Sequence, residues 1–154
     1  MSLSELTGSI RSQLTDAVLA IEERSPRRTW MTVRPERIRE VARYLFEDAG
    51  GRLATMTGVD GRDQIEVLYH FCFDHLGGVV TVRAQAAKPT PEIDSVTPII
   101  EAANWIEREI HDLLGMNFRG HPDMRRLLLA DDWPEGLYPL RRDVREKLPN
   151  YGRR

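Results

Sequence analysis

The sequence is poor in cysteine and has no long apolar run. Cys72 is the only cysteine among 154 residues. A single thiol cannot form a disulfide within the chain or supply the cysteine ligands of an iron-sulfur cluster. No apolar stretch approaches the ~20 residues that cross a bilayer, and residues 1–21 are amphipathic and acidic, unlike a signal peptide. We therefore expect a protein of a reducing cytoplasm that serves any membrane process from the water side.

The sequence also lacks a strong excess of one charge. It carries 22 basic and 24 acidic side chains, a formal net charge of −2. Residues 1–115 have 13 basic and 18 acidic groups, whereas residues 116–154 have nine and six. This difference predicts a basic tail that seeks an acidic or carboxylate-lined surface. The excess in the tail is too small to indicate a nucleic acid partner.

What the sequence does contain is a set of clear apolar periods, which predict a one-domain α+β fold. The predicted helices cover 4–23, 35–49 and 98–114. The predicted strands cover 29–33, 53–59, 65–74 and 79–87. Because short turns join the last three strands, they should pair antiparallel. We expect two layers, with helices packed on a mostly antiparallel sheet, followed by an extended C-terminal tail.

The helix at 98–114 is the best marked of these elements. Thr97 stands where an N-cap acceptor belongs, Pro98 fits the first helical position, and Gly115 can take the left-handed conformation that ends a helix. One side of this helix is apolar. The other side carries large polar and aromatic groups, namely Glu101, Trp105, Arg108 and Asp112.

That polar side predicts either an interface or a solvated surface. Tryptophan and arginine are enriched at the centres of protein interfaces, which favours the first reading for Trp105 and Arg108. In the alternative, the Trp105 ring lies across its neighbours and Arg108 pairs with Asp112 one turn on.

Candidate chemistry is sparse. Glu107, His111, His121 and Asp123 could together hold a metal ion, but their spacing matches no specific metal motif; the alternative is that the histidines cap or pack. The paired glycines of the chain lack both the Gly-x-Gly-x-x-Gly spacing and a P-loop lysine. We therefore expect no catalytic, cofactor-binding or metal-binding residues in this chain.

Residues 119–154 have apolar clusters without a helical or strand period. A structureless segment of this length is more often functional or bound to a partner than a simple connection. We predict an α+β domain at 1–118 and an extended partner-docking tail at 119–154. Part of the tail should fold over the domain and the rest should lie on another protein, becoming ordered as it binds.

Four sequence stretches follow one another in a specific order. They are NWIEREIHDLLGMNF at 104–118, GHPDMRR at 120–126, DDWP at 131–134 and PLRRD at 139–143. This series resembles the signature of the respiratory-chain NADH dehydrogenase 30 kDa subunit family, also called the C subunit of complex I. SVTP at 95–98 fits the same pattern. Two departures are His111 and Leu114, where the family commonly has an aromatic residue, and the end of the chain soon after Asp143, without the usual longer extension.

The resemblance implies a non-catalytic structural subunit. In that family the subunit has no redox centre of its own and sits in the hydrophilic arm. Its neighbours there are the iron-sulfur subunits and a large subunit of the forty-nine-kilodalton type. FMN, iron-sulfur clusters and quinone are bound by those partner subunits. The expected function is support of electron transfer to quinone, coupled to proton translocation, in a complex peripheral to the cytoplasmic side of the cell membrane.

The resemblance and the polar helix side together imply a partner interface. The expected interface and shape-fixing residues are Trp105, Glu107, Arg108, Glu109, Asp112, His121, Asp123, Arg125, Arg126, Trp133, Arg141 and Arg142.

Two alternatives remain open. Related shorter subunits occur in membrane-bound energy-converting hydrogenases and formate hydrogenlyase complexes, where a nickel-iron centre lies in a partner subunit. A more distant alternative is a stand-alone metal-dependent enzyme that uses Glu107, His111 and His121.

Overall fold

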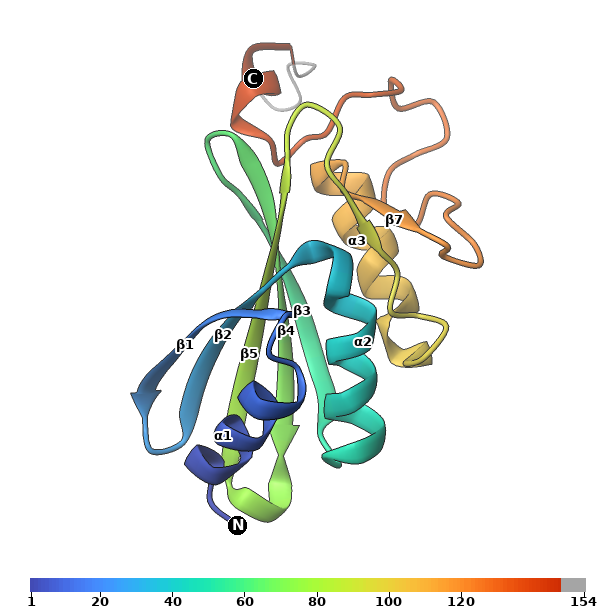
Figure 1. Cartoon of the computed structure of the whole chain (residues 1–154). Coiled ribbons are helices and arrows are strands. Elements are labelled where there is room, and N and C mark those ends of the chain that lie inside the picture. Colours follow the sequence, from blue (N-terminus) through green and yellow to red (C-terminus); the bar gives the residue numbers. More distant parts are fainter. Residues whose placement is uncertain (148–154) are drawn as a thin grey trace.

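A five-stranded sheet runs through the molecule (Figure 1). The computed structural model describes residues 1–147 and the side chains of residues 1–144, so residues 148–154 of the predicted tail lie outside the described residues. The strands lie in the order β1-β2-β5-β4-β3. Their bounds are β1 Val18–Ser25, β2 Arg28–Val33, β3 Arg52–Asp60, β4 Gln64–Phe73 and β5 Gly78–Ala87. The four predicted strands are confirmed, and β1 is additional.

The pairing of the strands follows from the lengths of their connections. Strands β3, β4 and β5 form the predicted antiparallel meander. Strand β1 pairs with β2 as an antiparallel hairpin, whereas β2 pairs with β5 in parallel. A parallel pair requires a long crossover connection, and here that connection contains a helix and the strands β3 and β4. The sheet is mostly antiparallel, as predicted.

Helices α1 (Leu3–Gln13) and α2 (Ile38–Arg43) lie on one face of this sheet (Figure 1). A 3-10 turn at Pro35–Arg37 precedes α2 and a wider π turn at Tyr44–Asp48 follows it. The three pieces together account for the helix predicted at 35–49. The α+β class with helices packed on the sheet is therefore confirmed.

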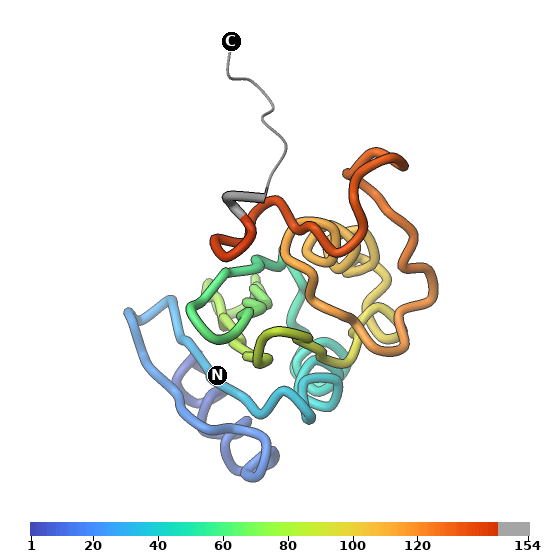
Figure 2. Tube along the Cα trace, turned by 90° about the horizontal axis from the view of Figure 1, so that it is seen from above, coloured from blue at the N-terminus to red at the C-terminus, as the bar shows by residue number. Residues whose placement is uncertain are grey.

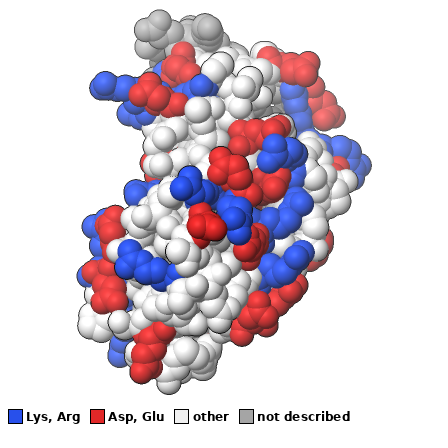
Figure 3. Space-filling model, viewed as in Figure 1, with Lys and Arg blue, Asp and Glu red and all other residues white. Residues whose placement is uncertain are grey.

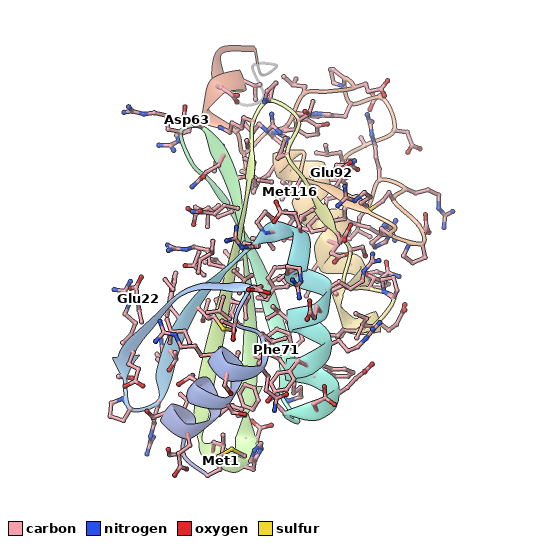
Figure 4. All side chains as sticks on the ribbon, viewed as in Figure 1. Met1, Glu22, Asp63, Phe71, Glu92 and Met116 are labelled. Atoms are coloured by element: carbon pink, nitrogen blue, oxygen red, sulfur yellow. The ribbon has the colours of Figure 1, made fainter. Side chains whose placement is uncertain are left out.

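The hydrophobic core lies between the sheet and these two helices. The predicted alternation along β4 places one face wholly inside it, with no exposed area at Ile65, Val67, Tyr69, Phe71 and Phe73. In Figure 4, Phe71 lies in the layer between the strands and the helices. Burial of each large apolar side chain contributes about 2–3 kcal/mol, so this layer holds the sheet together.

The helix predicted at 4–23 is wrong over its second half. Helix α1 begins with a capping box in which Ser2 and Glu5 exchange hydrogen bonds, and it ends at Gln13. Residues 18–25 form β1 instead, because they gain a ladder of backbone hydrogen bonds with β2. Tertiary pairing here overrides a helical spacing of apolar residues.

Helix α3 (Asn104–Leu114) begins later than predicted and ends where predicted. Gly115 takes the left-handed conformation, with φ of 70°, that ends the helix. Thr97 does not cap α3, because its hydroxyl donates a hydrogen bond to the buried Glu107 side chain. The predicted start is wrong because residues 98–100 form a turn and a loop and Glu101–Ala103 a 3-10 helix, so the α-helix itself begins only at Asn104.

The chain after α3 wraps around that helix (Figure 2). Strand β7 (Asn117–Arg119) pairs in parallel with β6 (Glu92–Asp94), so the domain boundary predicted at 118 falls inside a strand. Among the described residues, the chain beyond β7 has neither α-helix nor strand and ends in a 3-10 turn at Arg142–Lys147. No helix within residues 1–147 is long and apolar enough to cross a membrane.

Candidate partner-docking surface

Glu107 holds the loop that leads into α3. Its side chain has no exposed area. It accepts hydrogen bonds from the hydroxyls of Ser95 and Thr97 and from the backbone N–H of Val96, the last at 2.7 Å. Burial raises the pKa of Glu107 above 4.5, against the opposing effect of these hydrogen bonds. The carboxyl group therefore acts as an internal tie between α3 and the preceding loop.

His121 ties the loop after β7 to the same place. Its side chain is fully buried, with Nε2 3.8 Å from Glu107 Oε2. The backbone N–H of Asp123 donates to Nδ1 at 2.9 Å, so the neutral ring carries its proton on Nε2 and donates it to the carbonyl oxygen of Asn104 at 3.1 Å. The segments before and after α3 thus meet at its first turn.

The metal site weighed for Glu107, His111 and His121 is not assembled. His111 lies at the other end of α3, where its Nδ1 is 2.9 Å from the carbonyl oxygen of Met116. Among the described side chains, those of residues 1–144, no three from His, Cys, Asp or Glu form a group that could hold a metal ion. The histidines pack and bond to backbone, as the alternative reading proposed.

Asp112 holds the middle of the tail. Its side chain is 3% exposed, and one oxygen, Oδ2, accepts three consecutive backbone N–H groups. The donors are Leu127 at 2.8 Å, Leu128 at 2.8 Å and Leu129 at 3.2 Å. Hydrogen bonds to a carboxylate are stronger than those between neutral groups, so this one side chain fixes the course of the tail.

Arg108 binds the tail immediately before residues 127–129. Its guanidinium donates to the carbonyl oxygens of Arg125 at 2.9 Å and Arg126 at 3.1 Å. The pairing of Arg108 with Asp112 expected in the alternative reading is therefore wrong. Arg108 donates to backbone carbonyl oxygens and Asp112 accepts from backbone N–H groups. Both side chains therefore bind the same segment, residues 125–129.

The end of α3 anchors the last part of the tail. Leu140 N–H donates to the carbonyl oxygen of Leu113 at 3.0 Å, and the buried Arg141 guanidinium donates to those of Leu114 and Gly115. A Cβ atom on Gly115 would lie 2.4 Å from the Tyr138 ring, so no other residue fits there.

One further anchor joins the tail to the sheet. Arg142 N–H donates to Asp60 Oδ2 at 2.9 Å, at the end of β3. The other oxygen of Asp60 lies 2.6 Å from Lys88 Nζ. These cationic and backbone partners hold the pKa of Asp60 below 3.8 although burial opposes them.

Asp60, Ser95 and Thr97 were not singled out from the sequence as site residues. Only the resemblance at 95–98 pointed to the stretch that contains two of them.

Burial sorts the twelve expected interface residues into two groups. Those that lie inside and fix the shape are Glu107, Asp112, His121 and Arg141. Those that are exposed or half-buried are Trp105, Arg108, Glu109, Asp123, Arg125, Arg126, Trp133 and Arg142. The first group cannot touch a partner in this arrangement, because the protein's own chain covers it. The second group supplies the candidate docking surface.

Trp105 is the most exposed large aromatic of that surface, at 69%. The tail adds exposed apolar groups at Leu128 (55%) and Leu140 (59%). In Figure 3 the Lys/Arg and Asp/Glu side chains on the visible face are intermingled and do not form a large patch of one sign. An apolar and mixed-charge surface of this kind is suited to another protein.

A protein-family model described as the respiratory-chain NADH dehydrogenase 30 Kd subunit matches residues 31–149. The C subunit of F(420)H(2) dehydrogenase from Methanosarcina mazei is 36% identical over 152 residues, which cover 96% of this chain and 92% of that protein. The C subunit of NADH-quinone oxidoreductase from Roseiflexus sp. is 38% identical over 142 residues, covering 88% and 79%.

Two much longer relatives come from Escherichia coli. Hydrogenase-4 component G is 35% identical over 143 residues, which cover 90% of this chain but only 26% of that protein. Formate hydrogenlyase subunit 5 is 40% identical over 117 residues, covering 73% and 21%. The chain therefore spans about a quarter or less of these two proteins.

Two solved structures share the fold. A chain of the membrane-bound sulfane sulfur reductase, an archaeal respiratory membrane complex, superposes with a TM-score of 0.78 at 27% identity, covering 98% of this chain and 95% of that one. A trypsin-resistant fragment of Nqo5 superposes with a TM-score of 0.66 at 26% identity, covering 80% and 99%.

Proposed function

Because the chain belongs to the respiratory-chain NADH dehydrogenase 30 kDa subunit family, we propose that it is a non-catalytic structural subunit of a complex I-type NADH:quinone oxidoreductase. It lies in the hydrophilic arm, on the cytoplasmic side of the cell membrane, and docks the forty-nine-kilodalton-type subunit, called the large partner subunit below. FMN, iron-sulfur clusters and quinone are bound by partner subunits. This chain supports electron transfer to quinone, coupled to proton translocation, by holding those partners in register.

The observation that carries the proposal is the way α3 holds the tail. Side chains of α3 bind the backbone of residues 125–129, and the same segment leaves Leu128 exposed. Burying a charge such as that of Asp112 is costly unless it is fully hydrogen-bonded. The exposed loop is therefore held in one shape by hydrogen bonds. A loop that is already ordered loses little entropy on binding, as expected of a surface that another protein recognises.

This arrangement changes one step of the docking hypothesis. The sequence predicted that part of the tail folds over the domain and that the rest becomes ordered as it binds. Residues 127–129 and 140–142 are hydrogen-bonded to α3 and to β3, which supports a surface that is already formed along this part of the tail. We therefore propose docking onto a preformed surface by this part of the tail.

The second candidate is the equivalent subunit of a membrane-bound energy-converting hydrogenase or formate hydrogenlyase, with a nickel-iron centre in a partner. The similarity to hydrogenase-4 component G and formate hydrogenlyase subunit 5 supports it. In those longer proteins the matching segment is joined to additional chain, which is consistent with a module that works against a larger neighbour.

Affinity purification of the tagged full-length chain from its native membranes, in mild detergent, tests both candidates. Mass spectrometry should find the large partner subunit in the eluate. Flavin- and NADH-binding subunits alongside it would identify the first complex, and a nickel-iron large subunit without them would identify the second. Recovery of no large partner would overturn the structural-subunit proposal.

Variants of the docking surface test the proposed contact. Arg108→Ala and truncation after Phe118 should each reduce recovery of the large partner subunit. Arg28→Ala is the matched control, because Arg28 lies exposed in the β1–β2 hairpin, away from α3 (Figure 1). Unchanged recovery with both test variants would contradict docking through α3 and the tail.

A further inference from the structure

A depression of about 510 Å³ opens between α3 and the tail. Its lining residues are Arg108, Arg125, Arg126 and Asp131. Three guanidinium groups thus surround one hollow on the docking surface. Arginine is the side chain best suited to pairing with carboxylates, because its planar fork of N–H groups matches their geometry.

Two of the three guanidiniums are fixed by neutral partners. Arg108 donates to the carbonyl oxygens of Arg125 and Arg126. Arg126 Nη1 donates to those of Ala130 at 2.7 Å and Asp131 at 3.1 Å. Among the described residues, neither guanidinium forms an ion pair. Their positive charges are therefore held in place without a bonded carboxylate.

Other arginines of this half of the chain are neutralised differently. Arg119 reaches Glu92 at 3.0 Å and Asp94 at 2.7 Å. Arg125, which is 83% exposed, forms an ion pair with Asp123 at 2.7 Å. Of the three arginines that line the hollow, Arg125 forms an ion pair, whereas Arg108 and Arg126 form none within the described residues.

The acidic groups near the hollow only partly offset that charge. The guanidinium of Arg125, and more weakly that of Arg108, holds the pKa of Asp123 far below its usual range. Asp131 lines the hollow and forms no ion pair within the described part of the chain. The residues that line the hollow thus carry three guanidiniums and one carboxylate, and an anionic group entering the hollow would add to the neutralisation.

We propose that this arginine-lined hollow binds an acidic segment of the large partner subunit, with an Asp or Glu side chain of that segment held between Arg108 and Arg126. The inference rests on the proposed function and names the chemistry of the partner at that surface. Trp105 lies one turn before Arg108 on the same side of α3, and Leu128 follows Arg126 in the tail. Both are exposed, so the segment should carry an apolar side chain beside its carboxylate.

The rigidity of the hollow supports a specific partner. Asp112 fixes the loop at 127–129 from inside, and Arg108 fixes the carbonyls just before it. The side chains of Arg108 and Arg126 are already positioned by their bonds to backbone carbonyl oxygens, so binding between them costs little side-chain entropy. A fixed fork of donors discriminates a carboxylate from a neutral side chain.

Charge reversal tests the inference on the full-length chain within its native complex. Arg125→Glu is the first variant, because the exposed Arg125 side chain bonds to Asp123 within the same loop, whereas the loop is joined to α3 through the backbone of residues 125–129. It should lower recovery of the large partner subunit by roughly tenfold, the effect expected when a repulsive charge removes a favourable pair. Asp131→Lys adds positive charge to the same hollow and should retain or increase recovery.

Arg28→Glu carries the same charge change outside the hollow and should recover the large partner subunit as the wild type does. Limited proteolysis of each variant should show that the tail remains protected. Equal recovery with Arg125→Glu and with the wild type would overturn the acidic-segment inference alone. Failure of the wild type to recover any large partner would overturn both this inference and the proposed function.

Photocrosslinking identifies the segment directly. A photoreactive residue in place of Arg125 should crosslink a peptide of the large partner subunit that contains Asp or Glu, and the same residue at position 28 should not. Crosslinks from position 125 to a peptide without acidic residues, or to a different subunit, would contradict the inference.

Discussion

Two parts of this protein are held together by different forces. The sheet half comprises the five-stranded sheet with α1 and α2, and the tail half comprises α3 and the described chain that follows it. The sheet half depends on apolar burial, with the aromatic residues of β4 wholly inside the core. The tail half depends on a few buried polar side chains of α3, of which Glu107 and Asp112 are the central ones. Apolar contacts are numerous and non-directional, whereas each of these hydrogen bonds has a single geometry. A single polar substitution should therefore release part of the tail half without unfolding the sheet.

The largest effect is expected in the sheet half. Phe71→Ala leaves a cavity in the fully buried layer and should lower the free energy of unfolding by about 3–5 kcal/mol. Chemical denaturation monitored by circular dichroism measures this loss, with sheet and tail signals falling together. Phe71→Leu, which leaves a smaller cavity, should cost less. A loss below about 1 kcal/mol for the alanine variant would show that the core is not the main support.

A smaller but still global effect is expected at the junction of the two halves. Glu107→Ala leaves the donors of Ser95, Val96 and Thr97 without their acceptor. The free energy of unfolding should fall by about 2–3 kcal/mol, because buried donors without partners are costly. Glu107→Gln keeps one acceptor oxygen and should lose less. Equal losses for the two variants would show that the acceptor oxygen kept by glutamine contributes nothing, and would contradict the hydrogen-bonding role of this position.

The next effect should be confined to the tail. Asp112→Ala removes the common acceptor of three backbone N–H groups, so residues 127–129 should open more easily by about 2 kcal/mol. Hydrogen exchange should accelerate roughly 30-fold at these amides and stay unchanged in β4 and β5. Asp112→Asn keeps an acceptor and is the control. Faster exchange throughout the sheet would erase the distinction between the two halves.

The smallest effect is a dependence on pH. Burial raises the pKa of Glu107 above 4.5, so the folded chain keeps this proton where the unfolded chain has lost it. The contribution of Glu107 to stability should therefore grow as the pH falls from neutral to about 4.5, and level off below. Chemical denaturation of the wild type and of Glu107→Gln across this pH range gives the difference between their free energies of unfolding. The contributions of the other carboxyl groups are common to both proteins and cancel in this difference. A difference that shrinks on acidification would contradict the raised pKa.

The contrast between the halves also explains what the sequence could predict. Alternation along β4 and the glycine that ends α3 are local signals, and the structure confirms both. The false helix at 18–23 arose because apolar spacing cannot reveal a partner strand. The tail contacts could not be predicted, since Asp112 and Arg108 bind backbone groups that have no side-chain signature.

The family resemblance identified the right residues without their roles. It pointed to Glu107, Asp112 and His121 as a group, and the structure places all three inside the protein. The tail covers some of the expected residues and leaves others exposed. Its path therefore decides which residues fix the shape of the protein and which are available to a partner. That path depends on contacts between segments far apart in the sequence.

The most direct test of docking through α3 is the amount of the large partner subunit that co-purifies with Asp112→Ala, relative to wild type and to Asp112→Asn. The measurement is made from native membranes at a temperature where the sheet remains folded. If α3 builds the docking surface by holding the tail, Asp112→Ala should lose most of the large partner while Asp112→Asn retains more of it. Full recovery by Asp112→Ala, with the tail shown to be released by hydrogen exchange, would contradict this role of α3.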